Sequence, residues 1–253
     1  MSQTAVRSDI HCKEILPIDL ATVGILDAAK HLNDHGFLIT LARMATQPAN
    51  LPDSTTLEKQ LAEGHRDDRQ RQGFLARRRI ARAILAAEAG VDPQAVTITH
   101  GESGEPIVAM PGGRFHLSFS ARADIALIGI ARSPIGVDIE IIGPGMLIPL
   151  NMLRADERTL LEALPEGARA SAFCRLWTAK EAVVKALHCG FQMPPEAIHV
   201  DGWNTGDTLT LTALETRPGG VTAEASAWHL KTWPNLVVAE ETGGLVVGAA
   251  CIA

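Results

Sequence analysis

The chain has 253 residues, 46% of them hydrophobic, and a formal net charge of -6 at pH 7. This length and composition allow a substantial core in one large domain or two small ones, while the negative charge and the lack of a long lysine or arginine run argue against a nucleic-acid binder. No stretch approaches the roughly 20 apolar residues of a membrane span and residues 1–16 do not read as a signal peptide, so we expect a cytoplasmic protein without membrane contact.

Two helices are predicted early in the chain. Ser54 or Thr55 can cap the first, with Glu58 in its first turn, and the second runs from about Asp68 to Glu88, before a stop signal at Gly90. The apolar stripe of the longer helix consists of Phe74, Ala81, Ile84 and Leu85. Its remaining surface carries Arg71, Arg77, Arg78, Arg79 and Arg82. These arginines form either a solvated face or an anion site, and the sequence leaves both interpretations open.

Four strands are predicted next. A strand over Val96–His100 precedes a turn at residues 101–106, and residues 115–120 alternate with Phe115, Leu117 and Phe119 on one face. Two apolar strands follow, over Ile125–Ala131 and Ile135–Ile142. Because only three residues join them, we expect an antiparallel hairpin.

The rest of the chain reads as two helices and four strands. The helices are expected over Asp156–Leu164 and Ala170–His188, the second ended by Gly190. The strands are expected over Ile198–Trp203, Thr208–Thr212, Ala225–Lys231 and Leu245–Ile252. This order indicates an α+β fold with two similar halves that meet near residues 131–134.

Two acidic residues stand out in the strand over Ile135–Ile142. Strand alternation places Asp138 and Glu140 on the same face, roughly 7 Å apart, opposite the apolar side chains. In apolar surroundings, repulsion and desolvation would push a proton onto one of them unless a cation lies between. Hard oxygen ligands without a neighbouring imidazole or thiolate favour magnesium. A solvated acidic strand face is the alternative.

A third acidic residue lies on the helix over Ala170–His188. The apolar stripe of this helix leaves Thr178, Glu181 and Lys185 on a neighbouring face. Glu181 and Lys185 could also be an ordinary surface pair that contributes about 0.2–0.5 kcal/mol. Lys180, about 100° around the helix from Glu181, is expected to bring a second cation within reach of the same groove.

These segments together resemble a known family. The sequence Ile-Gly-Val-Asp-Ile-Glu at residues 135–140, followed by Leu-Trp-Thr-Ala-Lys-Glu-Ala-Val-Val-Lys at residues 176–185, is similar to the paired signature of 4'-phosphopantetheinyl transferases of the surfactin-synthetase-activating (Sfp) type. The resemblance extends from about Asp67 to the C-terminus. It implies an α+β fold of two similar subdomains, residues 1–133 and 134–253, related by a pseudo-twofold axis, with coenzyme A bound between them.

The resemblance also implies an activity and a site. A monomeric enzyme would transfer the 4'-phosphopantetheine group from coenzyme A to a serine of an acyl- or peptidyl-carrier protein. By the match of motifs, Asp138, Glu140 and Glu181 would hold Mg²⁺, Glu181 would act as the base, and Lys185 would contact a phosphate. The residues expected to contact coenzyme A are Arg78, Gly104, Glu105, Pro106, Ser118, Phe119, Ser120, Lys180 and Lys185.

The chain departs from the family pattern at coenzyme A recognition. Glu105 stands where the family usually has lysine, Phe119 where it has histidine, and Gly73 where it has arginine, which leaves Arg71, Arg77 and Arg78 as replacements. Because every expected metal and base position is kept, we favour an active transferase. The first alternative is a weak or inactive family member that binds coenzyme A or carrier proteins. The second is a different metal-dependent phosphotransfer enzyme.

Overall fold

The computed structural model describes residues 17–48, 50–142, 146–190 and 193–203, together with the backbone of three strands over residues 208–214, 228–234 and 244–252. Its helices are α1 (Leu20–His35), α2 (Thr56–Ala62), α3 (Asp68–Ala89), α4 (Ala155–Ala163) and α5 (Glu166–Ala186). Within these described residues, no helix combines the length and the apolar character needed to cross a membrane.

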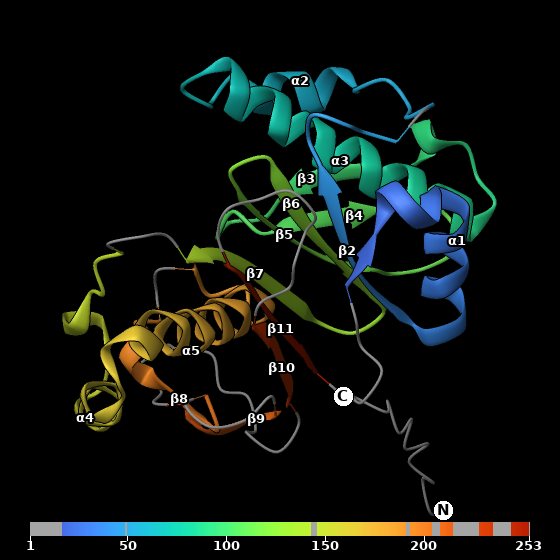
Figure 1. Ribbon diagram of the computed structural model, residues 1–253. Helices are drawn as coiled ribbons and strands as arrows, with labels where there is room; N and C mark the ends of the chain where they lie inside the picture. Colours follow the sequence, from blue (N-terminus) through green and yellow to red (C-terminus); the bar gives the residue numbers. More distant parts are fainter. Residues whose placement is uncertain are drawn as a thin grey trace, which may run out of the picture.

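The strands form two sheets, so the expected α+β class is confirmed. The first sheet has the order β1 (Ile18–Asp19), β2 (Phe37–Arg43), β6 (Ile125–Ala131), β5 (His116–Arg122), β4 (Pro106–Ala109) and β3 (Thr97–His100). The second has the order β7 (Ile135–Ile142), β11 (Gly244–Ile252), β10 (Trp228–Pro234), β9 (Thr208–Leu214) and β8 (Ile198–Asp201). Figure 1 shows α3 packed on the first sheet and α5 on the second.

The predicted hairpin between β6 and β7 is wrong. β6 pairs with β2 and β5, whereas β7 pairs antiparallel with β11 along its whole length. The chain therefore changes sheets between these two strands. The reason is that β6 and β7 are both apolar enough to pack face to face, and Ile135, Val137 and Ile139 form a core cluster with side chains of β2 and β6. Gly129 permits the contact, because a Cβ there would lie only 2.8 Å from Cγ1 of Val137.

The helices of the N-terminal half form as the sequence predicts. Thr55 and Glu58 make a reciprocal capping box at the start of α2, and Gly90 ends α3 in the left-handed conformation. All four residues of the predicted α3 stripe are buried: Phe74, Ala81, Ile84 and Leu85. Ala81, Ile84 and Leu85 join a core with residues of α1, β2 and β6. α1 and β2 had no counterpart in the sequence prediction.

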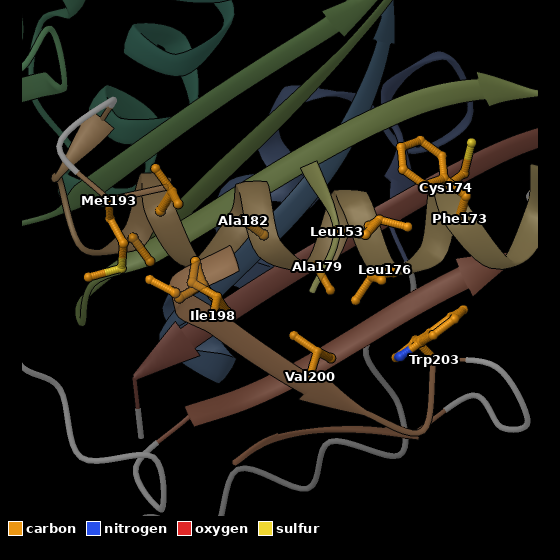
Figure 2. Packing of buried hydrophobic residues seen from close by; sticks show 14 of the residues in the cluster. Leu153, Phe173, Cys174, Leu176, Ala179, Ala182, Met193, Ile198, Val200 and Trp203 are labelled. Carbon is orange, nitrogen blue, oxygen red and sulfur yellow. The ribbon is translucent and has the colours of Figure 1, made fainter. Parts of the chain in front are cut away.

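α5 begins four residues earlier than predicted, at Glu166, and ends at Ala186 rather than His188. His188 itself adopts a left-handed conformation, with φ 54°, before Gly190, with φ 49°. The helix is buried on most of its circumference, because the second sheet, α4 and the segment before β8 surround it. Figure 2 shows part of this core, in which Leu176 and Ala179 of α5 lie near Val200 and Trp203.

β7 and α5 approach each other closely. A Cβ placed on Gly136 would lie 1.7 Å from the carbonyl oxygen of Ala182, a distance that no side chain can occupy. The opposite face of β7 packs on the first sheet through Val137 and Ile139. Asp138 therefore lies on the strand face that α5 covers, two residues beyond the contact at Gly136.

Candidate active site

A cavity of about 770 Å³ lies between the two halves of the chain. Its N-terminal wall consists of His65, Phe74, Arg77, Arg78, His100, Ser103, Gly104, Glu105, Pro106, Leu117, Ser118, Phe119 and Arg122. Its C-terminal wall consists of Asp138, Met152, Trp177, Glu181, Val184, Lys185, His188, Gly190, Met193, Pro194 and Pro195. The two walls differ in charged groups: the first carries three arginines and Glu105, and the second carries Asp138, Glu181 and Lys185.

Asp138 is held by residues from both halves. Its Oδ1 accepts hydrogen bonds from Nζ of Lys185, at 2.6 Å, and from Oγ of Ser120, at 2.8 Å. Lys185 also donates to the carbonyl oxygen of Val137. The other carboxylate oxygen, Oδ2, is buried and has no hydrogen-bond partner among the described residues. A buried anionic oxygen without a donor is costly, so Asp138 has one coordination position to offer a cation.

Glu181 lies one turn before Lys185 on α5 and faces the same cavity. Burial raises the pKa of its carboxyl group, and the nearby Asp138 carboxylate raises it further, while Lys185 and Arg122 oppose the shift. A carboxylate with a raised pKa is a stronger proton acceptor than an ordinary glutamate. Perturbed carboxylates in a cavity are typical of functional sites.

Glu140 is engaged elsewhere and does not line the cavity. Arg122 donates to both of its oxygens, with Nε 2.9 Å from Oε2. Within the described part of the chain, no three acidic, histidine or cysteine side chains are placed to hold one metal ion. The donor chemistry nevertheless suits Mg²⁺, because Asp138 presents a buried oxygen without a donor and Glu181 a desolvated carboxylate. The third expected ligand, Glu140, would first have to leave Arg122.

The opposite wall carries two arginines of α3, the half-buried Arg77 and the buried Arg78. Only 3% of Arg78 is exposed, and its guanidinium carbon lies 3.6 Å from the centroid of the Phe74 ring and 5.4 Å from that of Phe119. A terminal nitrogen of Arg78 contacts Nε2 of His100. Burial, together with the neighbouring charge of Arg77, lowers the pKa of Arg78 to about 10, so the side chain stays charged at neutral pH.

This arrangement favours the anion-site interpretation for part of the arginine cluster. Among the described residues, no carboxylate forms an ion pair with Arg77 or Arg78, and the Nε of each is buried without a hydrogen-bond partner. Two cations that have lost much of their hydration and have no carboxylate partner would be stabilised by an anion in the cavity. Two other arginines of α3 serve the fold instead, since Arg82 pairs with Glu58 and Arg79 donates to the carbonyl of Pro52.

Most of the other residues predicted to contact coenzyme A also line the cavity. Gly104 and Glu105 lie in the turn between β3 and β4, and Pro106 is the first residue of β4. The carboxylate of Glu105 folds back into this turn, where Oε2 accepts a hydrogen bond of 3.0 Å from the Ser103 amide. Ser118 and Phe119 line the cavity as well. The hydroxyl of Ser118 accepts a hydrogen bond from the Val137 amide, so Ser118 also connects the two sheets.

Two expectations need correction. Lys180 does not reach the cavity: it is fully buried, and Nζ donates to Oε2 of Glu157 and to the carbonyl oxygen of Pro195. The step of about 100° between Lys180 and Glu181 turns the lysine toward α4. Ser120 does not line the cavity either, because its hydroxyl points at Asp138. Its role in this structure is to position that carboxylate.

Several lining residues were not predicted, among them His65, His100, Trp177 and His188. The rings of His65 and His100 both pack on Phe74, with centroids 4.7 Å and 5.9 Å from its ring. They come from the segment before α3 and from the end of β3, so no local spacing connects them. The usable signal was the position of His100 directly before the Gly-Glu-Ser-Gly-Glu-Pro turn.

Known proteins similar to this chain come from one superfamily. A model of the 4'-phosphopantetheinyl transferase superfamily matches residues 134–242. The chain is 33% identical over 127 residues to 4'-phosphopantetheinyl transferase HetI of Nostoc sp., an alignment that covers 47% of this chain and 53% of HetI. It is 28% identical over 123 residues to the 4'-phosphopantetheinyl transferase of Bacillus subtilis, covering 48% of this chain and 54% of that protein.

A longer match is with 4'-phosphopantetheinyl transferase AcpT of Escherichia coli, 31% identical over 154 residues, which covers 59% of this chain and 72% of AcpT. The chain belongs to the 4'-phosphopantetheinyl transferase superfamily. It spans about half the length of HetI and of the Bacillus subtilis enzyme. The matched segment of the superfamily model contains Asp138, Glu140, Glu181 and Lys185.

Proposed function

We propose that this protein transfers the 4'-phosphopantetheine group of coenzyme A to a serine of an acyl- or peptidyl-carrier protein. The observation that carries the proposal is the composition of the cavity. Asp138, Glu181 and Lys185 line one wall, and the unpaired arginines Arg77 and Arg78 line the other. This distribution suits a ligand with anionic groups at two places, as coenzyme A has in its pyrophosphate and its 3'-phosphate.

The carboxylate wall would receive the pyrophosphate of coenzyme A. Asp138, Glu181 and Glu140 would hold Mg²⁺, which when bound supplies positive charge to the phosphate under attack. Lys185 already stands beside Asp138 and would donate to a phosphate oxygen. Ser120 and Lys185 together fix the orientation of the Asp138 carboxylate before any ligand arrives.

Glu181 is the proposed base. The carrier serine hydroxyl attacks the phosphorus that bears the pantetheine arm, the bond to the adenosine bisphosphate breaks, and the serine proton passes to Glu181 directly or through water. The raised pKa of Glu181 supports this role, because the proton is accepted more readily than by a solvated glutamate. The leaving group departs as 3',5'-adenosine bisphosphate, and no covalent enzyme intermediate is needed.

The arginine wall would bind the other anionic end of coenzyme A. Arg77 and Arg78 would take over contacts that the family pattern places at the positions of Gly73, Glu105 and Phe119. The Glu105 charge is less of an obstacle than its sequence position indicates, because the Ser103 amide already satisfies one of its oxygens. Phe119 packs near the Arg78 guanidinium and would help to hold it in place.

We further propose that the chain consists of two related subdomains, residues 1–133 and 134–253, with a pseudo-twofold relation between them. Each half has its own sheet, and the change of sheet falls between Ala131 and Ile135. Each half also pairs a short helix with a long one, α2 with α3 and α4 with α5.

The direct test is to incubate the protein with Mg²⁺, coenzyme A and a panel of apo carrier proteins of fatty-acid, polyketide and peptide type, and to determine the product masses. We expect at least one carrier protein to gain the phosphopantetheine mass on its serine, and none when that serine is replaced by alanine. Saturable coenzyme A binding without any transfer would instead favour a binding module. Turnover of another pyrophosphate compound with unmodified carrier proteins would favour a different phosphotransfer enzyme.

A further inference from the structure

Arg122 occupies an unexplained position at the edge of the carboxylate wall. It is the last residue of β5, directly before a tight turn in which Ala123 adopts φ 50°. Its side chain is 48% exposed and lines the cavity, and its guanidinium binds both oxygens of Glu140. A planar guanidinium on a carboxylate in this two-bond geometry is a specific and directional contact.

The charges of the carboxylate wall and of the adjacent Glu140 are almost balanced by other side chains of the protein. Three carboxylates, Asp138, Glu140 and Glu181, influence one another, because both Asp138 and Glu140 raise the pKa of Glu181. Two cations oppose them: Lys185 pairs with Asp138, and Arg122 pairs with Glu140. The pairing with Arg122 uses both oxygens of Glu140, and no three-ligand metal site is assembled among the described residues.

The two cations differ in how firmly they are held. Lys185 extends from the buried helix α5, is 28% exposed, and also donates to the backbone of Val137. Arg122 is more exposed, and within the described part of the chain its only hydrogen bond besides those to Glu140 goes to the carbonyl oxygen of its neighbour Ala121. Arg122 can therefore move away from Glu140 by side-chain rotation alone, without any shift of β5.

We propose that Arg122 is a displaceable counterion of Glu140. A divalent cation must replace Arg122 before Glu140 can act as a metal ligand. In this arrangement Arg122 is a positioning residue that acts through Glu140. It stabilises the metal-free wall and competes with the metal ion. The inference rests on the proposed function, since it assumes that the carboxylate wall takes a divalent cation.

The test is to measure Mn²⁺ binding to the full chain without substrate. The electron paramagnetic resonance signal of the unbound ion reports how much Mn²⁺ is bound. We expect Arg122→Gln to bind Mn²⁺ about two- to fivefold more tightly than the parent protein, the range that a half-exposed ion pair allows. The same variant should have a lower melting temperature in the presence of a chelator. A change in packing alone would lower the melting temperature without tightening Mn²⁺ binding.

A matched control is Arg132→Gln. Arg132 is also 48% exposed and pairs with a carboxylate, Glu88, but it does not line the cavity. This variant should leave Mn²⁺ binding unchanged. If it tightened Mn²⁺ binding as much as Arg122→Gln does, the effect would come from net charge and the proposal would be overturned.

A double-mutant cycle separates displacement from a general electric field. In a Glu140→Gln background, Arg122 has no carboxylate to release, so Arg122→Gln should no longer tighten Mn²⁺ binding. Equal tightening in both backgrounds would overturn the proposal. If Arg122→Gln binds Mn²⁺ no more tightly than the parent, while the parent still modifies a carrier protein, the proposal for Arg122 is overturned and the proposed function stands. If the parent neither binds Mn²⁺ nor modifies a carrier protein, the proposal for Arg122 and the proposed function are both overturned.

Discussion

The two halves of the molecule use the same support for different chemistry. In the N-terminal half, Glu58 caps α2 by accepting from the Thr55 amide and is bound by Arg82 of α3, at 2.8 Å. In the C-terminal half, Glu157 caps α4 by accepting from the Arg154 amide and is bound by Lys180 of α5, at 2.7 Å. Both ion pairs are essentially inaccessible to solvent.

The correspondence continues along the chain. Arg82 also donates to the carbonyl of Pro93, and Lys180 to the carbonyl of Pro195. Each proline begins a short 3-10 helix, Pro93–Ala95 or Pro195–Ala197, that leads into the edge strand of its sheet. Each long helix is thus tied to the short helix before it and to the loop after it by one buried cation.

The difference lies in what each long helix presents to the cavity. α3 presents Arg77 and Arg78, whereas α5 presents Glu181 and Lys185. In both long helices the buried ion pair supports the fold, while other side chains of the same helix line the cavity. Substitutions at the two kinds of position should therefore separate stability from activity.

The largest expected effect is on the reactive side of α5. Glu181→Gln should lower carrier-protein modification by about 10²- to 10⁴-fold, the range for loss of a general base, while the folded structure persists. Single-turnover transfer measured by mass spectrometry, with circular dichroism as the check on folding, tests this expectation. A parent rate in a folded Glu181→Gln protein would refute the base assignment.

The buried supports should have large and similar effects on stability in both halves. Arg82→Met and Lys180→Met each leave a carboxylate buried without its partner, and we expect each to lower the free energy of unfolding by about 3–5 kcal/mol. Arg71→Met is the control, because Arg71 pairs with the exposed Asp68 and should change stability by less than about 0.5 kcal/mol. Urea unfolding measures all three. If only one buried substitution were costly, the two supports would not be equivalent.

On the N-terminal wall, Arg78→Gln should weaken coenzyme A binding by about 10- to 100-fold, the loss expected when a charged hydrogen-bond donor is removed. Calorimetry gives the dissociation constant, and Arg71→Gln on the same helix provides a control outside the cavity. An unchanged dissociation constant for Arg78→Gln would mean that the anionic end of coenzyme A does not reach α3.

A smaller effect concerns the stability of the metal-free protein. The folded state raises the pKa of Glu181 above the ordinary value, so the ionised carboxylate destabilises the fold at neutral pH. With a chelator present, Glu181→Gln should melt a few degrees higher than the parent at pH 7. The difference should vanish as the pH falls below the ordinary glutamate pKa, because Glu181 is then protonated in both the folded and the unfolded parent protein. A lower melting temperature at pH 7 would contradict the shift.

The smallest effect is expected at the turn between β3 and β4. Glu105→Gln keeps an acceptor for the Ser103 amide and removes one negative charge from the cavity, so coenzyme A should bind about two- to threefold more tightly at low salt. The gain should disappear at high ionic strength, where such charges are screened. A gain that persists in high salt would point to a direct contact instead.

The sequence was sufficient for elements whose signals are local. The capping box of α2, the glycine that ends α3 and the strand β7 with its acidic face all follow from residues within a few positions of each other. The pairing of strands was not local. Alternation identified β6 and β7 correctly as strands, but the same apolar pattern allows either edge-to-edge pairing or face-to-face packing, and the second occurs.

The site followed the same division. Asp138, Glu181 and Lys185 were recoverable because a motif and two periodicities place them. Lys180 was misplaced because an amphipathic pattern assumes that one face of a helix is solvated, whereas α5 is buried on most sides. His65 and His100 were missed because they meet only through Phe74, a contact that tertiary packing creates.

The lack of a side chain at Gly136 sets how closely β7 and α5 can approach. Because the carbonyl oxygen of Ala182 lies where a side chain would begin, any residue other than glycine at position 136 would push the strand that carries Asp138 away from the helix that carries Glu181. A single methyl group at this position would work as a wedge, separating the two carboxylates without touching either one. The distance between the Asp138 and Glu181 carboxylates therefore depends on a residue that has no functional group of its own.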